Sequence, residues 1–215
     1  GKMIHLFDHR FGTYEGQTQS QANLGTLPQV TDEQHADPEY APLPRYWVPK
    51  SEVEGRLKAR WSRNWLFGWR DVTNAVVVRT FIGSTIPRYG ANHKVLLLFP
   101  SEAHISVSFG LTANLSSFVF DFICRQKIGG GSMGYFIVKQ LPVLNPEEYR
   151  RDWRVDNRLP NLGSWLRPRV LEMTYTSSEL SGFARDMGYS GPVFEWDSFR
   201  RFIIQCELDA AFFHL

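Results

Sequence analysis

The chain has 215 residues and a formal net charge of +2, and 43% of its residues are hydrophobic and 14% aromatic. This composition predicts a folded chain with one main core and excludes a disordered tail. No window approaches the 18 consecutive apolar residues of a membrane span, and no signal-peptide pattern opens the chain, so we expect a cytoplasmic protein. The two cysteines, Cys124 and Cys206, are expected to be reduced core thiols, because both lie in apolar helical patterns.

The charge is unevenly distributed along the chain. Residues 45–139 contain thirteen basic and five acidic residues, a net charge of +8, whereas residues 1–44 and 140–215 carry −4 and −2. A polyanion is expected to bind where positive charge is concentrated, on one continuous concave face. Charge alone leaves open the alternative of a solvated basic surface without a partner.

The first 44 residues divide into two parts. Residues 3–14 mix apolar and polar side chains and begin abruptly, which suggests a piece of a longer protein. Residues 15–44 are rich in Gln, Pro and Asp and predict a long surface loop. His5, Asp8 and His9 have a spacing that a metal site can use, but zinc needs a further ligand. We therefore expect hydrogen-bonding histidines and no metal.

The basic middle region predicts helix and strand in alternation. Ser51 is placed as a helix N-cap, with Glu54 at the capping-box position. A run of Trp and Arg follows at residues 60–71, and its tryptophans are expected in the core. Runs of β-branched and apolar residues predict strands at 75–82, 94–99, 104–109 and 135–141.

The remaining elements are predicted to be helical. A hydroxyl-capped helix beginning near residues 114–117 is apolar around most of its circumference, so we expect it to be buried on several sides until the glycines at 129–131 end it. Further helices are expected near residue 147 and over 165–175, 180–187 and 197–213. The last helix is expected to bury the stripe formed by Phe199, Phe202, Ile203, Cys206, Ala210 and Phe213.

These elements predict an α+β fold class, with a mixed β-sheet domain over residues 1–145 and a helical C-terminal subdomain over residues 146–215. Catalytic residues are not expected. The tetrapeptide Asp37-Pro38-Glu39-Tyr40 resembles the motif that polarises an adenine amine, but Glu39 replaces its second proline and no buried strand precedes it.

Arginine forks and amide groups in the loops of the basic region match the hydrogen-bonding pattern of base edges in the DNA major groove. The candidates for base contacts are Arg70, Asn74, Arg88, Asn92 and His93. Phosphate contacts position a protein on DNA without specifying a sequence. The candidates for phosphate contacts are Arg60, Arg63, Lys94, Lys127, Ser132 and Lys139.

Several segments occur in an order that carries a family resemblance. They are KMIHLFDHRF at 2–11, GWRDVTN at 68–74, RTFI at 79–82, Ile86-Pro87, NLSSFVFDF at 114–122, RQKIGG at 125–130, QLPVL at 140–144 and ELDAAFFHL at 207–215. Together they resemble the target-recognition and C-terminal region of large bacterial adenine-N6 DNA methyltransferases. These enzymes belong to the type IIG restriction–modification group and its phage-defence relatives.

The resemblance implies a module that selects the DNA sequence in which a separate catalytic domain flips and methylates adenine. Its partners would be double-stranded DNA and that catalytic domain of the same parent chain. The cofactor S-adenosylmethionine would bind in the parent's catalytic domain, and no cofactor is expected in this chain. The alternative function is a protein–protein docking or scaffold domain of a restriction–modification or phage-defence complex.

Overall fold

The computed structural model describes residues 1–152 and 161–215. Helices and a three-stranded antiparallel sheet form one body, which confirms the α+β fold class. The elements are α1 (Gln19–Leu24), α2 (Asp32–Ala36), α3 (Lys50–Leu57), β1 (Trp65–Arg70), β2 (Gly83–Pro87), β3 (Val95–Leu98), η1 (Glu102–Val107), α4 (Ser108–Ser116), α5 (Phe118–Lys127), α6 (Tyr135–Val138), η2 (Pro146–Arg150), α7 (Leu162–Thr174), η3 (Ser178–Leu180), α8 (Ser181–Asp186) and α9 (Ser198–Phe213).

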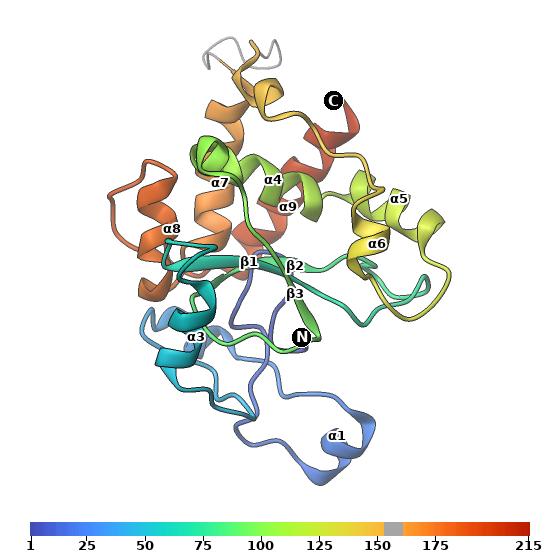
Figure 1. The fold of residues 1–215 in the computed structure, drawn as a ribbon, viewed down its shortest axis with the longest axis vertical. Helices are drawn as coiled ribbons and strands as arrows, with labels where there is room; N and C mark the ends of the chain where they lie inside the picture. Colours follow the sequence, from blue (N-terminus) through green and yellow to red (C-terminus); the bar gives the residue numbers. More distant parts are fainter. Residues whose placement is uncertain (153–160) are drawn as a thin grey trace.

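The sheet lies in the middle of the molecule, with α4, α7, α8 and α9 on one side and the N-terminal segment on the other (Figure 1). β1 is the central strand, and β2 and β3 pair with it on either side. Trp61, Trp65 and Trp69 are all buried, as expected for core anchors. Gly68 lets β3 approach, because a Cβ at this position would lie only 2.8 Å from Cγ1 of Val95.

The strand predicted at residues 75–82 is wrong. Val76 and Val78 are each 91% exposed, and the segment is a turn. The carbonyls of Val77 and Val78 accept hydrogen bonds from the Arg125 guanidinium, each at 2.6 Å, and the backbone N–H of Val76 donates to Asn74. These side chains satisfy backbone groups that a neighbouring strand would otherwise have to pair.

Of the other strand predictions, the one at residues 94–99 is confirmed by β3. Those at 104–109 and 135–141 are wrong, because the first segment forms η1 and the start of α4 and the second forms α6. The outer edge of β3 is not available to a fourth strand. There the hydroxyl of Tyr135 accepts from the backbone N–H of Leu97 at 3.0 Å and donates to its carbonyl at 2.9 Å.

The N-cap predicted at Ser51 is wrong, because Ser51 lies inside α3, whose N-cap position is Pro49 without a side-chain cap.

The C-terminal helices were predicted close to where they occur. The buried faces expected for α9 and α5 are wrong. The Asp197 side chain caps α9 by accepting from the backbone N–H of Arg200. α9 buries the face formed by Ile204, Leu208, Ala211 and Phe212. The stripe expected to be buried is largely exposed, with Cys206 on it, and Phe118 and Phe122 of α5 are exposed as well. Cys124 is buried, as predicted.

The core is shared by the segments before and after residue 145. α7 packs on α4, and α9 packs on α5 and α7. One cluster of buried apolar side chains runs from Leu6 to Phe212 and includes residues of all these helices. The helices after residue 145 are therefore packed on those before it and do not bury a separate core of their own. No single helix among the described residues has the length and apolar composition needed to cross a membrane.

The N-terminal segment is held by a buried arginine. Arg10 is completely buried, and its guanidinium donates to the carbonyls of Asp37 at 2.8 Å, His35 at 3.0 Å and Thr176 at 2.7 Å. Asp8 pairs with His35 at 3.3 Å. The segment at 15–44, which was expected to be a long loop, contains the short helices α1 and α2. Arg10 connects this segment to the C-terminal part of the chain.

We expect Arg10→Met to lower the free energy of unfolding by about 3–5 kcal/mol, because it leaves several buried carbonyls without donors. Urea unfolding followed by circular dichroism measures this change. Arg151→Met is the matched control, since Arg151 is 74% exposed and Glu148 is its only ion-pair partner among the described residues. It should cost less than about 1 kcal/mol. Equal effects of the two substitutions would contradict the structural role of Arg10.

Candidate nucleic-acid interface

Arg70, at the end of β1, is engaged inside the molecule. Its Nε donates to the carbonyl of Ile4 at 2.8 Å, and its Nη2 donates to the same carbonyl. Burial lowers the pKa of its guanidinium to about 10. The Arg70 guanidinium, which was predicted to contact a guanine edge, is therefore bound to the backbone of the N-terminal segment.

Arg88 and Arg63 also hold the chain together. Nη1 of Arg88 donates to the carbonyls of Trp61 at 2.7 Å and Arg63 at 2.9 Å. Arg63 itself forms ion pairs with Glu102 and Asp186. Both arginines therefore connect the segment between α3 and β1 to its neighbours.

Three further candidates meet around the end of β1. Lys94 and Ser132 both bind the carboxylate of Asp71, the lysine at 3.1 Å. Asn74 is exposed, and its Oδ1 accepts from the backbone N–H groups of Val76 and Val77, so only its amide NH₂ remains available to a ligand.

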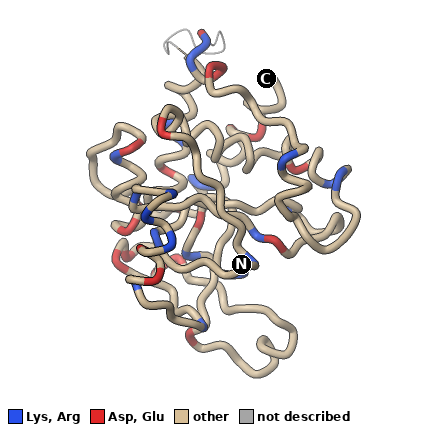
Figure 2. The backbone as a smooth tube through the Cα atoms, in the orientation of Figure 1, with Lys and Arg blue, Asp and Glu red and all other residues tan. Residues whose placement is uncertain are grey.

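Most of the arginines expected to form a continuous cationic face have partners inside the part of the chain that the structure describes. Five of the eight arginines in residues 45–139 are used in internal bonds or ion pairs: Arg63, Arg70, Arg79, Arg88 and Arg125. Figure 2 shows Lys and Arg spread over the whole molecule, with acidic residues among them. Lys127 and Lys139 are exposed, on α5 and just after α6.

The remaining candidates lie around one open groove, with a cavity volume of about 530 Å³. Arg60 lies on one wall, and Asn92 and His93 belong to the loop before β3. The full lining is Arg56, Leu57, Arg60, Ala91, Asn92, His93, Val95, Leu96, Leu97, Phe99 and Tyr135. We call this the β3 groove.

The β3 groove combines cations with an apolar floor. The side chains of Arg56 and Arg60 are exposed and form no ion pair or hydrogen bond with any residue the structure describes. Their i, i+4 spacing places them on the same side of α3 and the turn that extends it, where the N–H of Arg60 bonds to Leu57. Tyr135 also lines the groove and packs edge-on against Trp69, with the ring centroids 5.2 Å apart.

This arrangement suits an elongated anion. Two unpaired guanidiniums provide forked donors for phosphate, the amide of Asn92 and the imidazole of His93 provide polar contacts, and the floor accepts apolar surface. A second groove of about 480 Å³ is lined by Lys50 and Arg88 together with Glu54 and Glu179, so it lacks the excess of positive charge found in the β3 groove. Among the described residues, no group of His, Cys, Asp and Glu side chains is arranged to hold a metal ion.

Sequence reasoning anticipated only part of the β3 groove. Arg60, Asn92 and His93 were candidates, whereas Arg56 and Tyr135 were not. The spacing of Arg56 and Arg60 was a usable signal for the former. Tyr135 was hidden because its segment was predicted to be a strand.

Comparisons with protein-family models, with curated proteins and with solved structures find no match to this chain.

His5, which lies near Arg70, is expected to make the free energy of unfolding depend on pH. Burial, and then the positive charge of Arg70, lowers the pKa of His5 to about 4, so the ring is neutral at pH 7. Between pH 6.5 and pH 4 the unfolded chain binds a proton that the folded chain does not bind, so stability falls as the pH drops. This contribution is absent above the unfolded pKa of about 6.5.

We therefore expect His5→Gln to remove about 2 kcal/mol of the acid-induced loss of stability across this window. The measurement is the free energy of unfolding in urea at several pH values from 7 to 4. His104→Gln is the control, since His104 is exposed and its ring bonds to Ser101 at the surface, and it should leave the pH profile unchanged. A parallel pH profile for His5→Gln and the unmodified chain would rule out this origin.

Proposed function

We propose that this chain is the DNA-recognition module of a larger S-adenosylmethionine-dependent adenine-N6 DNA methyltransferase, and that it transfers no methyl group itself. The ordered resemblance of its segments to such enzymes supports the family. The proposal for the interface rests on one observation, the unpaired guanidiniums of Arg56 and Arg60 beside Asn92 and His93 in the β3 groove.

The two sides of the β3 groove would have different tasks. Arg56 and Arg60 would bind phosphates and fix the position of the duplex, while Asn92 and His93 would approach base edges. Lys58, between the two arginines, is exposed and adds positive charge to the same turn. Arg70 and Arg88 do not enter the proposed interface, because releasing either guanidinium would leave backbone carbonyls without their donors.

The catalytic steps would belong to a separate domain of the parent chain. That domain would supply S-adenosylmethionine and the site for the flipped adenine. This chain would contribute binding energy and sequence selection. Lys127 and Lys139, which do not line the β3 groove, remain candidates for peripheral phosphate contacts.

A protein-docking function is the second candidate, and a specific observation favours it. α9 and α5 both carry exposed phenylalanines, which form an apolar surface. Such a surface is unusual on α9, because the opposite face of this helix is already buried in the core. Docking through such a surface would respond little to salt, whereas DNA binding through phosphates weakens steeply.

The double substitution Arg56→Ala, Arg60→Ala tests the proposed phosphate contacts. We expect the chain to bind mixed-sequence duplex DNA with an affinity that falls as salt rises, and the double variant to bind roughly tenfold more weakly at low salt. The slope of log affinity against log salt should become shallower by about 2, or about 0.9 for each lost phosphate contact. Fluorescence anisotropy of a labelled duplex over a salt series measures both values.

The matched control is Arg150→Ala, Arg151→Ala, which removes the same charge from a distant exposed site. It should leave the slope unchanged. Absence of salt-dependent binding by the unmodified chain, or equal losses in the two double variants, would refute the proposed interface.

The proposed base contact of His93 leads to a separate prediction. Because His93 would contact bases and not phosphates, His93→Ala should alter the sequences recovered from a random duplex pool while preserving the salt slope. Sequencing the bound fraction gives the preference at each position. An unchanged preference together with a shallower slope would assign His93 to the backbone instead.

A further inference from the structure

We propose that the exposed face of α9 binds a second copy of this chain, forming a two-fold symmetric dimer. The face is continuous along the helix, with Phe199 and Phe202 in the first half, Cys206 in the middle and Ala210 and Phe213 in the second half. All five residues are exposed, and the opposite face is buried in the core. This inference does not depend on the proposed DNA binding.

The order of side chains on this face is self-complementary. Phe199 and Phe213 each lie seven residues from Cys206, and Phe202 and Ala210 each lie four residues from it. When two copies of α9 cross in antiparallel orientation at Cys206, Phe199 of one copy meets Phe213 of the other. Phe202 then meets Ala210, and the two cysteines meet at the axis. A two-fold axis requires such matching of one surface to itself.

The pairing of Phe202 with Ala210 also fits the packing of two helices. Helix axes approach to about 8–10 Å when side chains of one helix fill the gaps between those of the other. In the proposed dimer the large side chain of Phe202 lies opposite the methyl group of Ala210, which allows this close approach at both symmetric positions. A partner of unrelated sequence would have no reason to match this spacing about Cys206.

The exposed area is sufficient for a specific dimer. Phe199, Phe202 and Phe213 on α9 are between 62% and 75% exposed, and Phe118 and Phe122 on α5 are 56% and 55% exposed. At about 200 Å² for each phenylalanine, the three on α9 expose about 400 Å² in each copy, and the two on the neighbouring helix α5 raise this to about 600 Å². A standard interface buries about 800 Å² per partner, so the flanking residues need to add little.

The charges along the borders of this face favour an apolar partner. Arg79 pairs with Asp209 at 2.6 Å, Arg169 with Glu207 at 2.7 Å, and Arg200 with Glu172 at 2.8 Å. Because these three border pairs are neutralised within one copy, a second copy would not have to compensate their charges. The same neutrality makes the face unsuitable for a nucleic acid.

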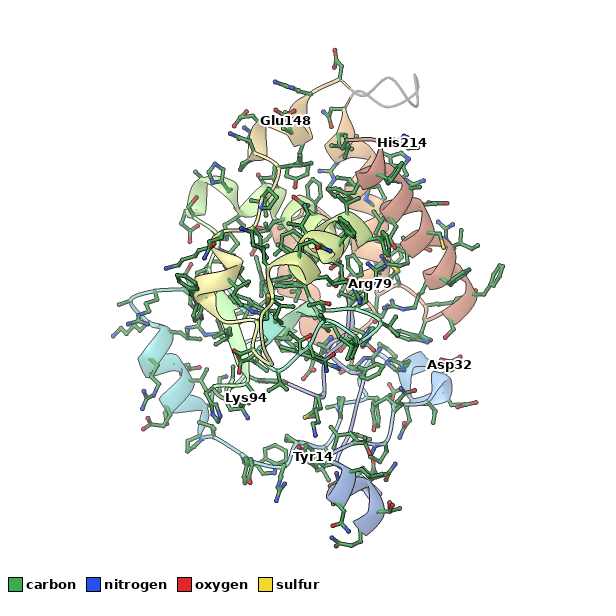
Figure 3. The ribbon with its side chains drawn as sticks, turned by 90° about the vertical axis from the view of Figure 1, so that its right-hand side faces the viewer. Tyr14, Asp32, Arg79, Lys94, Glu148 and His214 are labelled. Atoms are coloured by element: carbon green, nitrogen blue, oxygen red, sulfur yellow. The ribbon has the colours of Figure 1, made fainter. Side chains whose placement is uncertain are left out.

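The position of α9 leaves the β3 groove free in the dimer. In Figure 3, α9 runs along one side of the molecule, from near Asp32 up to His214, and α3 lies at the opposite side together with Lys94. Two copies joined through α9 would therefore direct their β3 grooves away from each other.

The test is the oligomeric state of the full chain by sedimentation velocity over a concentration series. We expect a dimer that dissociates on dilution. Phe202→Asp and Ala210→Arg should each raise the dissociation constant at least roughly tenfold, because each places a buried charge opposite an apolar residue. Phe136→Asp is the matched control, since Phe136 is 81% exposed on α6, and it should keep the dimer.

Combining Phe202→Asp with Ala210→Arg tests the register. In the proposed pairing each new carboxylate meets a new guanidinium of the other copy, so the double variant should recover dimerisation. A short bifunctional maleimide should link the two copies through Cys206, and Cys206→Ser should abolish the link while the buried Cys124 cannot replace it.

Two results would overturn the proposal. One is a monomer at every concentration up to the solubility limit. The other is a dimer that persists in both single variants, which would place the interface elsewhere. Recovery of the dimer in the double variant would exclude misfolding as the cause of the single-variant losses.

Discussion

The structure depends on arginine side chains that satisfy backbone carbonyls. The sheet has only three strands, and long irregular segments connect the elements, so many carbonyls have no partner in a ladder or helix. Arg10 binds carbonyls from the loop before α3 and from the chain after α7, Arg70 binds the N-terminal segment, and Arg125 binds the turn at 75–78. Each guanidinium has five fixed donors, so one side chain can join two or three distant segments.

This constraint determines which cations remain for a ligand. An arginine that holds backbone carbonyls cannot move to a phosphate without leaving those acceptors buried and unpaired. The basic middle third is therefore a poor guide to binding by charge alone. The cations of α3 and the turn after it differ, because Arg56 and Arg60 make no internal bond with the described residues and line the β3 groove. Arginines engaged in internal bonds and arginines proposed to bind a ligand are thus separated within a single charged region.

Local signals in the sequence were partly predictive, and signals that depend on tertiary packing were not. The hydroxyl cap at Ser117 was predicted because a cap involves only neighbouring residues. The same kind of signal was wrong at Ser51, because α3 begins at Lys50 and Pro49 occupies its N-cap position. β1 was missed because its residues are buried on both faces and show no alternation. The α+β class followed from the mixture of patterns, although several strands were misplaced. Residue type alone was enough to propose Arg60, Asn92 and His93 as candidates. It could not predict that they line one groove together with Tyr135.

The face of α9 illustrates the same limit. This helix carries apolar residues on both sides, so periodicity identified the helix without deciding which side the core covers. Contacts with α5 and α7 decide it, and they bury Ile204 and Leu208. The stripe that was expected to be buried is therefore an exposed apolar face of α9.

The proposed division between structural and DNA-binding arginines can be measured directly by arginine-specific modification with phenylglyoxal. Mass spectrometry reads the modification residue by residue, with and without duplex DNA. We predict slow modification of Arg10, Arg70 and Arg88 in both conditions, because their guanidiniums are engaged in internal bonds. Arg56 and Arg60 should react rapidly in the free chain and become protected by DNA. Rapid modification of Arg70 and Arg88 in the free chain, or no protection of Arg56 and Arg60 by DNA, would contradict this account.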